Sequence, residues 1–401
     1  MEFDIVVVGA GPAGLSFAAS LADSGLRLAL VERLGAAELA DPPFDGREIA
    51  LTHRSLELLE GLGAWARIPT AQVSPMMEAR VLNGQSPYAL RFDAGAARKG
   101  GPLGHLVANH LIRRALHDVA IGLPEVTLIA GTAVAGVETT SEGATVRLAD
   151  GRVLTARLAV AADTRFSEMR RRQGIAAEMR DFGRVMMVCR VAHDLPHDQT
   201  ATEWFDYGQT IAMLPVNTDE AHGHQSSFVL TLPAHGMDPV MAMDAVEFGA
   251  EATRRYRGRL GEMRLVSTRH AYPLVSVYAS RFTGTRFALM GDAAVGMHPV
   301  TAHGFNFGLR GADALARRVR AAATAGRDIG AADLLRGYDR EHRMATRPTY
   351  LATNATALLY ADERLPARML RDAALRVGNL LPPFRQIITA RLMESGRKRA
   401  A

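Results

Sequence analysis

The chain has 401 residues, of which 48% are apolar, so it is long enough to fold into about two globular domains. Its formal net charge of +5 comes from charges of both signs scattered along the chain, which argues against a nucleic-acid-binding surface. The single cysteine, Cys189, excludes a disulfide bond within the chain, a CxxC redox pair and a thiolate-rich metal site, and we expect no metal site.

The sequence predicts a cytoplasmic protein. Its first residues read as a strand rather than as a signal peptide, and no apolar run approaches the ~18 residues of a membrane-spanning helix. A basic end would favour peripheral contact with an anionic membrane. Its residues are Arg385, Arg391, Arg397, Lys398 and Arg399.

The N-terminal stretch predicts a strand, a glycine-rich turn, a helix and a second strand. The β-branched run of residues 5–8 is typical of a buried parallel strand. Pro12 suits the first turn of a helix, and Gly25 is a candidate for the residue that ends it. A second strand is expected at residues 28–31, directly before Glu32. This order of elements is that of a dinucleotide-binding unit.

The glycines and the acidic residue of this unit each have a physical role in binding a dinucleotide. Gly9 permits the tight turn, Gly11 lets the backbone approach a pyrophosphate, and Gly14 lets the helix pack on the strand. Glu32 can accept a hydrogen bond from a ribose hydroxyl and argues against the 2′-phosphate of NADP. The pattern therefore predicts FAD or NAD as the ligand.

Two polar residues further along the chain are candidates for contact with the cofactor. Arg47 is expected in a loop near the first unit, where it is either a cation beside the flavin or its phosphates or a solvated loop arginine. A helix is predicted over residues 105–119, with Asn109 and Arg113 on one polar edge that touches the cofactor.

Strand-like segments dominate the middle of the chain. Short strands are predicted at residues 126–130, 133–138, 144–148 and 153–161. The last of them leads to Asp163. From about residue 180 to residue 263, alternating strands predict a second, sheet-based lobe. Its Met and aromatic residues suit either a wall for an apolar ligand or an ordinary sheet core.

A second unit made of a strand, a turn and a helix is predicted towards the end of the chain. The strand that begins at Phe287 ends at Gly291 and Asp292, and a long helix begins at about Gly304. Asp292 is placed to bind the ribitol hydroxyls of a flavin, and the helix dipole to stabilise negative charge on its reduced ring.

Three motifs together resemble those of the class A flavin-dependent aromatic hydroxylases, the para-hydroxybenzoate hydroxylase type. They are the first glycine motif with Glu32, the Asp163 segment, and Gly291-Asp292 followed by His298-Pro299 and Gly304-Phe-Asn306. Within that family, the segments that follow Arg47 and Gly304 are most similar to the ubiquinone-biosynthesis hydroxylases. Among these hydroxylases, the sequence looks most like the broad-regioselectivity members, which act on demethoxyubiquinol-type intermediates.

The resemblance implies an α/β fold in which a smaller β-sheet substrate domain interrupts a Rossmann-like FAD-binding domain. The FAD-binding domain is then expected at residues 1–71, 99–179 and 264–330. The substrate domain is expected at residues 72–98 and 180–263, and a C-terminal helical segment at residues 331–401. Pro348 is read as a helix breaker within this last segment.

The resemblance also implies FAD as the cofactor and NAD(P)H as a transient electron donor. The residues expected to bind FAD are Gly9, Gly11, Ala13, Gly14, Glu32, Arg33, Arg47, Asn109, Asp163, Asp292, Pro299, Gly304, Phe305 and Asn306. The catalytic residue stays unknown, with His303 and Arg47 as candidates. His298 is expected to be structural and to orient the turn at Pro299.

The sequence departs from the family pattern at two places. Asp163-Thr164 stands where the family has Asp-Gly, and because Thr does not adopt a positive φ cheaply, this turn is expected to differ in shape. Ala302-His303-Gly304 stands where the family has Gly-Gln-Gly. His303 is therefore either a ligand of flavin or substrate or an adapted loop residue.

The implied activity is monooxygenation. Reduced FAD and O2 form a hydroperoxide, which transfers one oxygen atom to the aromatic ring of a prenylated phenol or quinol in ubiquinone biosynthesis. Such an enzyme would work peripherally at the inner membrane or with a ubiquinone-biosynthesis complex. A FAD-dependent prenyl-chain reductase of the same fold and a non-catalytic flavin-binding subunit are the alternatives.

Overall fold

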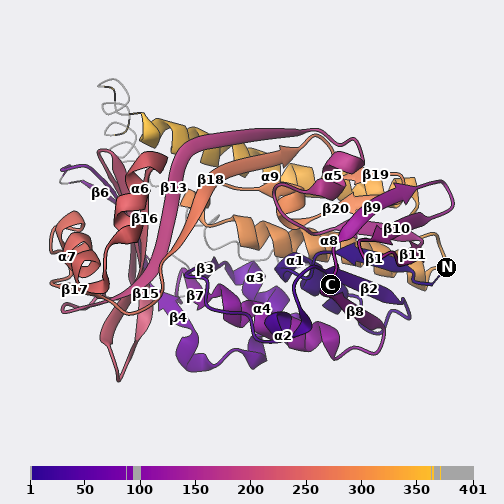
Figure 1. The fold of residues 1–401 in the computed structure, drawn as a ribbon, viewed down its shortest axis with the longest axis horizontal. Helices are drawn as coiled ribbons and strands as arrows, with labels where there is room; N and C mark the ends of the chain where they lie inside the picture. The colour runs from indigo at the N-terminus through magenta and orange to yellow at the C-terminus, as the bar shows by residue number, and fades with distance from the viewer. Residues whose placement is uncertain (1, 87, 94–100, 363, 365–370, 372–401) are drawn as a thin grey trace.

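The computed structural model describes residues 2–86, 88–93, 101–362, 364 and 371 (Figure 1). The basic residues predicted to contact a membrane, from Arg385 to Arg399, lie outside the described residues, as does nearly all of the predicted helical segment beyond residue 362. Among the helices of the described ranges, none is both long and apolar enough to cross a membrane.

A six-stranded sheet is built around the first strand of the chain. In order across the sheet its strands are β19 (Thr283–Gly284), β20 (Phe287–Leu289), β12 (Leu158–Ala161), β1 (Ile5–Val8), β2 (Leu28–Glu32) and β8 (Val126–Ala130). All neighbours are parallel except β19, which is antiparallel to β20. The carboxyl ends of β1, β12 and β20 therefore meet at one edge, where parallel sheets bind their ligands.

Helices cover this sheet and connect it to the rest of the molecule. The helix α1 (Pro12–Ala19) packs against α4 (Asn109–Ile121) and α8 (Gly304–Thr324). In turn, α8 packs against α9 (Ala332–Ala361). A separate antiparallel sheet of β9 (Val134–Thr139), β10 (Ala144–Leu148) and β11 (Val153–Ala156) lies beside them, followed in the chain by α5 (Glu168–Arg172).

A nine-stranded sheet forms the second half of the molecule, at the left of Figure 1. Along its main path the order is β21 (Val295–Gly296), β18 (His270–Ala279), β13 (Ala177–His193), β16 (Gly223–Pro233), β15 (Gln209–Asp219), β14 (Thr200–Asp206), β5 (Glu78–Asn83) and β6 (Ala89–Asp93), and β17 (Met263–Leu265) pairs with β13. The long strands β13 and β18 extend from this sheet towards the half of the molecule that holds the six-stranded sheet (Figure 1).

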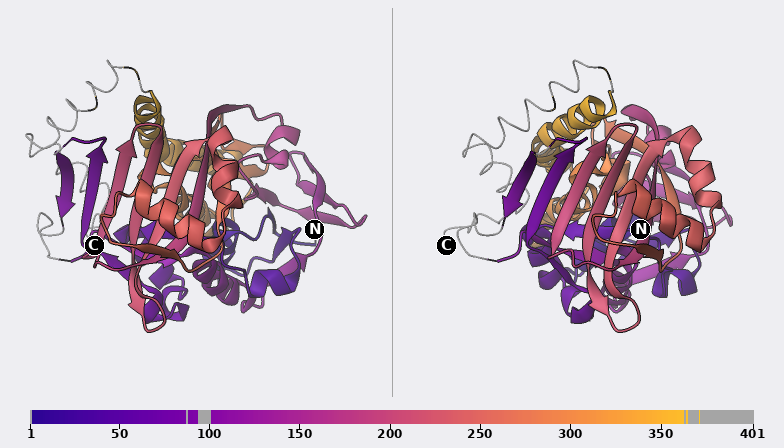
Figure 2. Two further views of the ribbon diagram at one scale, coloured as in Figure 1. Left: turned by 60° about the vertical axis from the view of Figure 1, so that its left-hand side comes forward. Right: turned by 90° about the vertical axis from the view of Figure 1, so that its left-hand side faces the viewer.

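The two faces of the nine-stranded sheet have different neighbours. The helices α6 (Met237–Ala242) and α7 (Ala245–Arg255) lie across one face, here called the outer face (Figure 2). The buried outer-face residues that pack with these helices are Met187, Cys189, Val191, Trp204, Ile211, Met213, Phe228, Leu230 and Leu232. The opposite face, here called the inner face, is turned towards the rest of the chain. The Met and aromatic residues predicted as a candidate ligand wall are thus mostly an ordinary core.

A small third sheet joins the two large ones. It consists of β3 (Glu48–Leu51), β7 (Gly104–Ala108) and β4 (Ser74–Met76), with β7 antiparallel to both of its neighbours. The helices α2 (Ala36–Ala40) and α3 (His53–Gly61) flank β3 in the chain. Met76 of β4 and Leu103 belong to one apolar cluster with Leu90, Phe92 and Ala201 of the nine-stranded sheet.

Two predicted boundaries are wrong because long-range strand pairing decides them. The predicted helix 105–119 begins only at Asn109, since residues 104–108 form β7 between two distant strands. The predicted strand 153–161 is two strands, because β11 pairs with β10 while β12 enters the six-stranded sheet beside β1.

Two predicted helix ends are also wrong. The helix α1 ends at Ala19 and not at Gly25, because the N–H groups of Leu21 and Ala22 bond to carbonyls three residues earlier and form turns. Pro348 lies inside α9 and does not break it. Proline removes the bond to the carbonyl four residues earlier, and that residue, Met344, is exposed, so water can satisfy its carbonyl.

Candidate functional site

The first glycine turn is closed by contacts that leave one side open. Gly9 has a φ of 109°, and a Cβ there would lie 2.5 Å from the carbonyl oxygen of Ala162. A Cβ on Gly14 would lie 2.0 Å from the carbonyl oxygen of Gly9, which requires glycine at both positions. A Cβ on Gly11 would meet nothing within 4 Å, so this is the place where a ligand can approach the backbone.

Glu32 is held at the end of β2 by the backbone. Its Oε2 accepts a hydrogen bond from the N–H of Ala10 at 2.9 Å, and its Oε1 accepts from the N–H groups of Arg33 at 2.9 Å and Leu34 at 3.2 Å. These bonds orient the carboxylate beside the glycine turn, while Oε2, which accepts only one of them, keeps a lone pair for a ribose hydroxyl. The Arg33 side chain itself is exposed.

The structure brings the second predicted motif against the first. Gly291 has a φ of 58° and begins the short helix η5 (Gly291–Ala293), and a Cβ there would lie 2.9 Å from the Cβ of Ala13. A Cβ on Gly308 in α8 would lie 3.9 Å from the same atom. The amino ends of α1 and α8 therefore lie close to each other at the carboxyl edge of the six-stranded sheet.

Asp292 is paired with an arginine that sequence reasoning did not identify as a site residue. Arg165 donates to Oδ2 of Asp292 from Nε at 3.2 Å and from Nη2 at 2.9 Å. Its Nη1 also donates to the carbonyl of Val275 in β18 at 3.0 Å. Arg165 thus links the Asp163 segment, Asp292 and the nine-stranded sheet. The signal available in the sequence was only its position two residues after Asp163.

Asp163 lies half-buried just after the end of β12, and one of its oxygens, Oδ1, is buried. Its Oδ1 has no hydrogen-bond partner among the described residues, and burial raises the pKa of the carboxyl. Thr164 does not adopt a positive φ, so the turn closes without the left-handed residue that glycine would permit. The buried Arg170 fixes this turn by donating to the carbonyls of Arg165 at 3.1 Å and Ala293 at 3.0 Å.

The loop before β3 presents Arg47 in a network of side chains. Arg47 Nη2 lies 2.5 Å from Asp45 Oδ2, which also accepts from Asn109 Nδ2 at 2.7 Å. Tyr272 on β18 donates to the carbonyl of Asp45 at 2.8 Å. Burial alone would lower the pKa of Arg47, but the hydrogen bond and charge of Asp45 outweigh it and raise the pKa. Arg47 is therefore a fixed cation, in the loop where the sequence predicted it.

The turn before α8 contains the remaining predicted residues. His298 accepts at Nδ1 from the N–H of Val300 at 3.2 Å and caps the short helix η6 (Pro299–Thr301), so its predicted structural part is confirmed. Burial, reinforced by the charges of Arg165 and Arg184, lowers its pKa to about 4. Pro299 is exposed on this turn.

His303 and Asn306 follow this turn and are both buried. The Nδ1 of His303 bonds to the carbonyl of Thr301, and its ring centroid lies 5.6 Å from that of Phe307. Asn306 accepts from the N–H of Thr52 at 3.1 Å and donates to the carbonyls of Ala50 and Ala302, each at 2.9 Å. These bonds make Asn306 a tie between the β3–α3 junction and α8. Phe305 packs against the main core.

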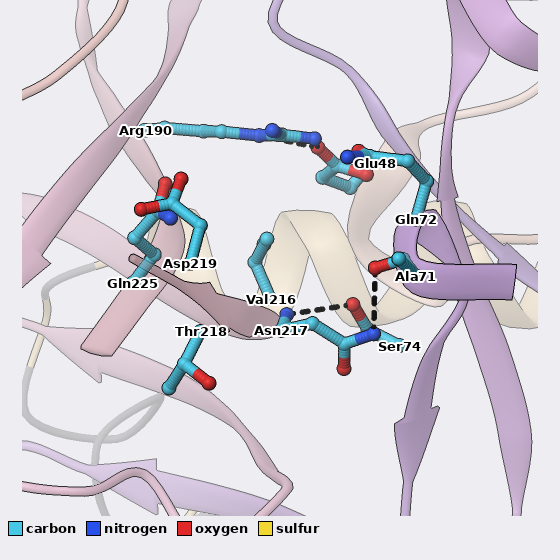
Figure 3. A pocket seen from close by; sticks show the side chains of 10 residues that line it. All are labelled: Glu48, Ala71, Gln72, Ser74, Arg190, Val216, Asn217, Thr218, Asp219 and Gln225. Atoms are coloured by element: carbon cyan, nitrogen blue, oxygen red, sulfur yellow. Dashed lines mark hydrogen bonds and ion pairs between the residues drawn. The ribbon is translucent and has the colours of Figure 1, made fainter. Parts of the chain in front are cut away.

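A small polar cavity of about 90 Å³ lies between the third sheet and the nine-stranded sheet (Figure 3). On its wall, Arg190 of β13 donates to Oε1 of Glu48 from Nη2 at 2.6 Å, and burial raises the pKa of Glu48. Ser74 accepts from the N–H of Asn217 at 2.9 Å on the opposite side. The volume suits about three water molecules and is too small for a prenylated ring.

Comparison with known proteins adds to this geometry. The family described as FAD binding domain matches residues 2–349. The ubiquinone hydroxylase UbiM of Neisseria meningitidis serogroup C is 47% identical over 395 residues, which cover 98% of this chain and 85% of that protein. The ubiquinone hydroxylase UbiL of Rhodospirillum rubrum is 32% identical and covers 97% of this chain and 89% of that protein.

A solved structure shares the fold over nearly the whole length. The p-nitrophenol 4-monooxygenase PnpA from Pseudomonas putida DLL-E4 superposes with a TM-score of 0.78, at 18% identity, over 99% of this chain and 100% of that chain. At this identity the likeness concerns the fold alone.

Proposed function

We propose, because the chain belongs to the FAD-binding domain family and to the ubiquinone hydroxylases within it, that it inserts one atom of O2 into the aromatic ring of a prenylated phenol or quinol. The chain is an FAD-dependent aromatic monooxygenase of ubiquinone biosynthesis. The observation that carries the choice of substrate is the 47% identity to a ubiquinone hydroxylase over 98% of the chain.

The residues at the carboxyl edge of the six-stranded sheet fit FAD. The open side of Gly11 suits the pyrophosphate. The buried Oδ1 of Asp163, which has no partner among the described residues, can accept a hydrogen bond from the ligand. Glu32 would hold the ribose and Asp292 the ribitol, with Arg47 and Asn109 at the flavin end. Bound FAD supplies the activation of O2, and the chain's residues hold the ring, fix a cation beside it and exclude water.

Loss of flavin from an Asp292 variant tests this assignment. Asp292→Ala should retain FAD roughly tenfold more weakly, because it removes one hydrogen-bonding group from the ribitol end. Asp150→Ala is the matched control, since Asp150 also pairs with an arginine, Arg152 at 2.6 Å, but in an exposed turn. Flavin released per chain on dialysis is the measurement, and equal retention by both variants would remove Asp292 from the FAD site.

Oxygen labelling tests the reaction. With ¹⁸O2 in the gas phase, the isolated product of a short-chain prenylated phenol should gain one labelled oxygen atom, and with H2¹⁸O it should gain none. A prenyl-chain reductase, the alternative with the same fold, would add only two hydrogens to the tail. A product that gains only those hydrogens, or that takes its label from water, would contradict the hydroxylase.

We also propose NAD(P)H as the transient electron donor, which is supported by the resemblance to class A aromatic hydroxylases. Under anaerobic conditions, NADH or NADPH should bleach the flavin absorbance faster when the phenol is present. Absence of bleaching by either nucleotide would point to another donor.

Contact with the inner membrane, directly or through a biosynthetic complex, is proposed as the route to the apolar substrate. One face of α9 exposes Met344, Leu351 and Leu358, spaced seven residues apart and 73%, 50% and 43% exposed. The sequence that follows is basic, which complements an anionic lipid surface. Flotation with anionic vesicles should recover the wild type at low salt and less of a variant with Gln at these three positions. Failure of the wild type to float at any salt would contradict direct contact.

A further inference from the structure

Glu203 is an ionisable residue of β14 that the site described above does not use. Along β14 successive side chains alternate between the two faces of the sheet. Its neighbour Trp204 belongs to the outer-face core with α6 and α7, so Glu203 projects from the inner face.

The strand register places Glu203 at one end of a row of inner-face residues whose other end lies against the loop of Arg47. Glu203 pairs with Ala212, Ala212 with Val229, and Val229 with Val188, so these residues share the inner face. A Cβ on Gly46 would lie 2.6 Å from Cγ2 of Val188, which brings the loop of Arg47 against the far end of this row. Three strand spacings separate Val188 from Glu203, or roughly 14 Å, which is room for an aromatic ring between loop and carboxyl.

Apolar contacts cover the chain on both sides of Glu203. Ala201, two residues earlier on the same face, belongs to the cluster of Met76 and Leu103. Phe205, two residues later, stacks on Tyr360 of α9 with ring centroids 3.7 Å apart. The end of the row at Glu203 therefore lies between the third sheet on one side and α9 on the other.

The Glu203 carboxyl has no partner of its own. It forms no hydrogen bond and no ion pair with any described residue, and it keeps part of its surface accessible. The paired strands present Val81 and Ala212, and the titratable side chain that α9 brings to the adjacent position is Tyr360. Burial alone raises the pKa of Glu203 to about 8. The carboxyl is therefore mostly protonated at neutral pH and can donate a hydrogen bond.

We propose that Glu203 positions the substrate ring by donating a hydrogen bond to an oxygen substituent of that ring. The proposal rests on the proposed function, since it assigns a recognition group to the prenylated phenol or quinol. The apolar row from Ala212 to Val188 lies against the ring face, and Glu203 is the polar group that fixes which way the ring is turned. A half-buried donor that no described residue pairs with favours a ligand with an acceptor at that point.

The test uses a probe that can only accept a hydrogen bond at its ring oxygen. Binding of the methyl ether of 2-geranylphenol to the FAD-loaded protein is measured by equilibrium dialysis between about pH 6.5 and about pH 9.5. The wild type should lose roughly tenfold in affinity as Glu203 loses its proton. Glu203→Gln keeps a donor without an ionisable proton and should bind with little pH dependence, whereas Glu203→Leu should bind weakly at every pH. Glu142→Gln, in an exposed turn, is the control and should behave as the wild type.

The outcomes separate this proposal from the one on which it rests. Wild-type binding with the same pH dependence as Glu203→Gln, or unimpaired binding by Glu203→Leu, would overturn the positioning by Glu203 and leave the hydroxylase assignment intact. If the wild type binds neither the ether nor 2-geranylphenol itself, the result contradicts the prenylated-phenol substrate. It then also contradicts the proposal that Glu203 positions such a ring. Full flavin content of both variants serves as the check that the fold is retained.

Discussion

The two faces of the nine-stranded sheet are built from alternating residues of the same strands, yet their energetics differ. On the outer face, Trp204 is fully buried under α7 and donates from Nε1 to the carbonyl of Gly84 at 3.0 Å. On the inner face, Glu203 has no partner among the residues that the structure describes, and Arg190 forms a partly buried ion pair with Glu48. The outer face satisfies its polar groups, whereas the inner face keeps groups that are costly to bury.

This difference indicates which face serves stability and which serves function. Polar groups whose burial lowers the stability persist where a ligand uses them, since selection for stability alone would replace them. The turn η6 adds a further cost, because Ala302 has a φ of 52° in the left-handed region. The ring of Phe182, at the irregular part of β13, contacts His298 at the start of this turn with centroids 4.6 Å apart.

The largest expected effect is on the outer face. Trp204→Ala should lower the free energy of unfolding by about 4 kcal/mol, because it leaves a large cavity and breaks the bond to Gly84. Denaturant titration followed by circular dichroism measures this loss, with Trp204→Phe as the control that keeps a ring. A loss below about 1 kcal/mol would contradict the view that the outer face carries stability.

Breaking the inner-face ion pair should give the next largest effect. Arg190→Met leaves Glu48, whose side chain is 3% exposed, without its cation and should cost about 3 kcal/mol at pH 8. The pKa of Glu48 is already raised by burial and would rise further without Arg190. The unfolded carboxyl ionises first as pH rises, so the loss should be larger at pH 8 than at pH 5. An equal loss at both values would show that the pKa of Glu48 in the folded protein does not depend on Arg190.

The sequence was sufficient for the strands β1 and β2 and for the first glycine turn between them. A β-branched run followed by glycines is a local signal, and β1 begins and ends at the predicted residues. The motifs around Asp292 and Arg47 led to their prediction as site residues, but their partners Arg165 and Asp45 were not predicted. The strand β7 was missed because its state depends on pairing with β3 and β4, which are distant in sequence.

Glu203 could not be recognised from the sequence for a similar reason. The stretch Thr-Glu-Trp-Phe predicts a strand with alternating faces, but either face of such a strand can be the covered one. The face is decided by α6 and α7, which pack on Trp204 from a later part of the chain. An isolated glutamate between a threonine and a tryptophan reads as a solvent-facing residue until that packing is known.

Thermal stability offers a further test of the inner face that needs no substrate. Burial raises the pKa of Glu203 from its ordinary value of 4.5 to about 8, so the unfolded chain loses this proton at lower pH than the folded chain. The wild type should therefore lose stability relative to Glu203→Gln as pH rises from about 4.5 to about 8, and no further above that. The melting temperature of the Gln variant should exceed that of the wild type by a few degrees at pH 8.5 and be similar at pH 5. A constant difference across this range would mean that Glu203 ionises normally.

The smallest expected effect concerns Ala302 in the turn that borders the inner face. A left-handed conformation costs a non-glycine residue roughly 1 kcal/mol, and glycine avoids this cost. Part of the resulting stabilisation is lost again, because glycine has greater conformational freedom in the unfolded chain. Ala302→Gly should therefore raise the free energy of unfolding by about 0.5 kcal/mol, whereas the β-branched Ala302→Val should lower it by more than about 1 kcal/mol. Ala37→Gly, at an exposed position in α2, is the control with the opposite sign, because glycine in a helix costs about 1 kcal/mol. Denaturant titration of the three variants measures these changes. If Ala302→Gly destabilises the protein as Ala37→Gly does, the turn stores no strain at Ala302. The contrast between the two faces then rests on Glu203 and the Glu48–Arg190 pair alone.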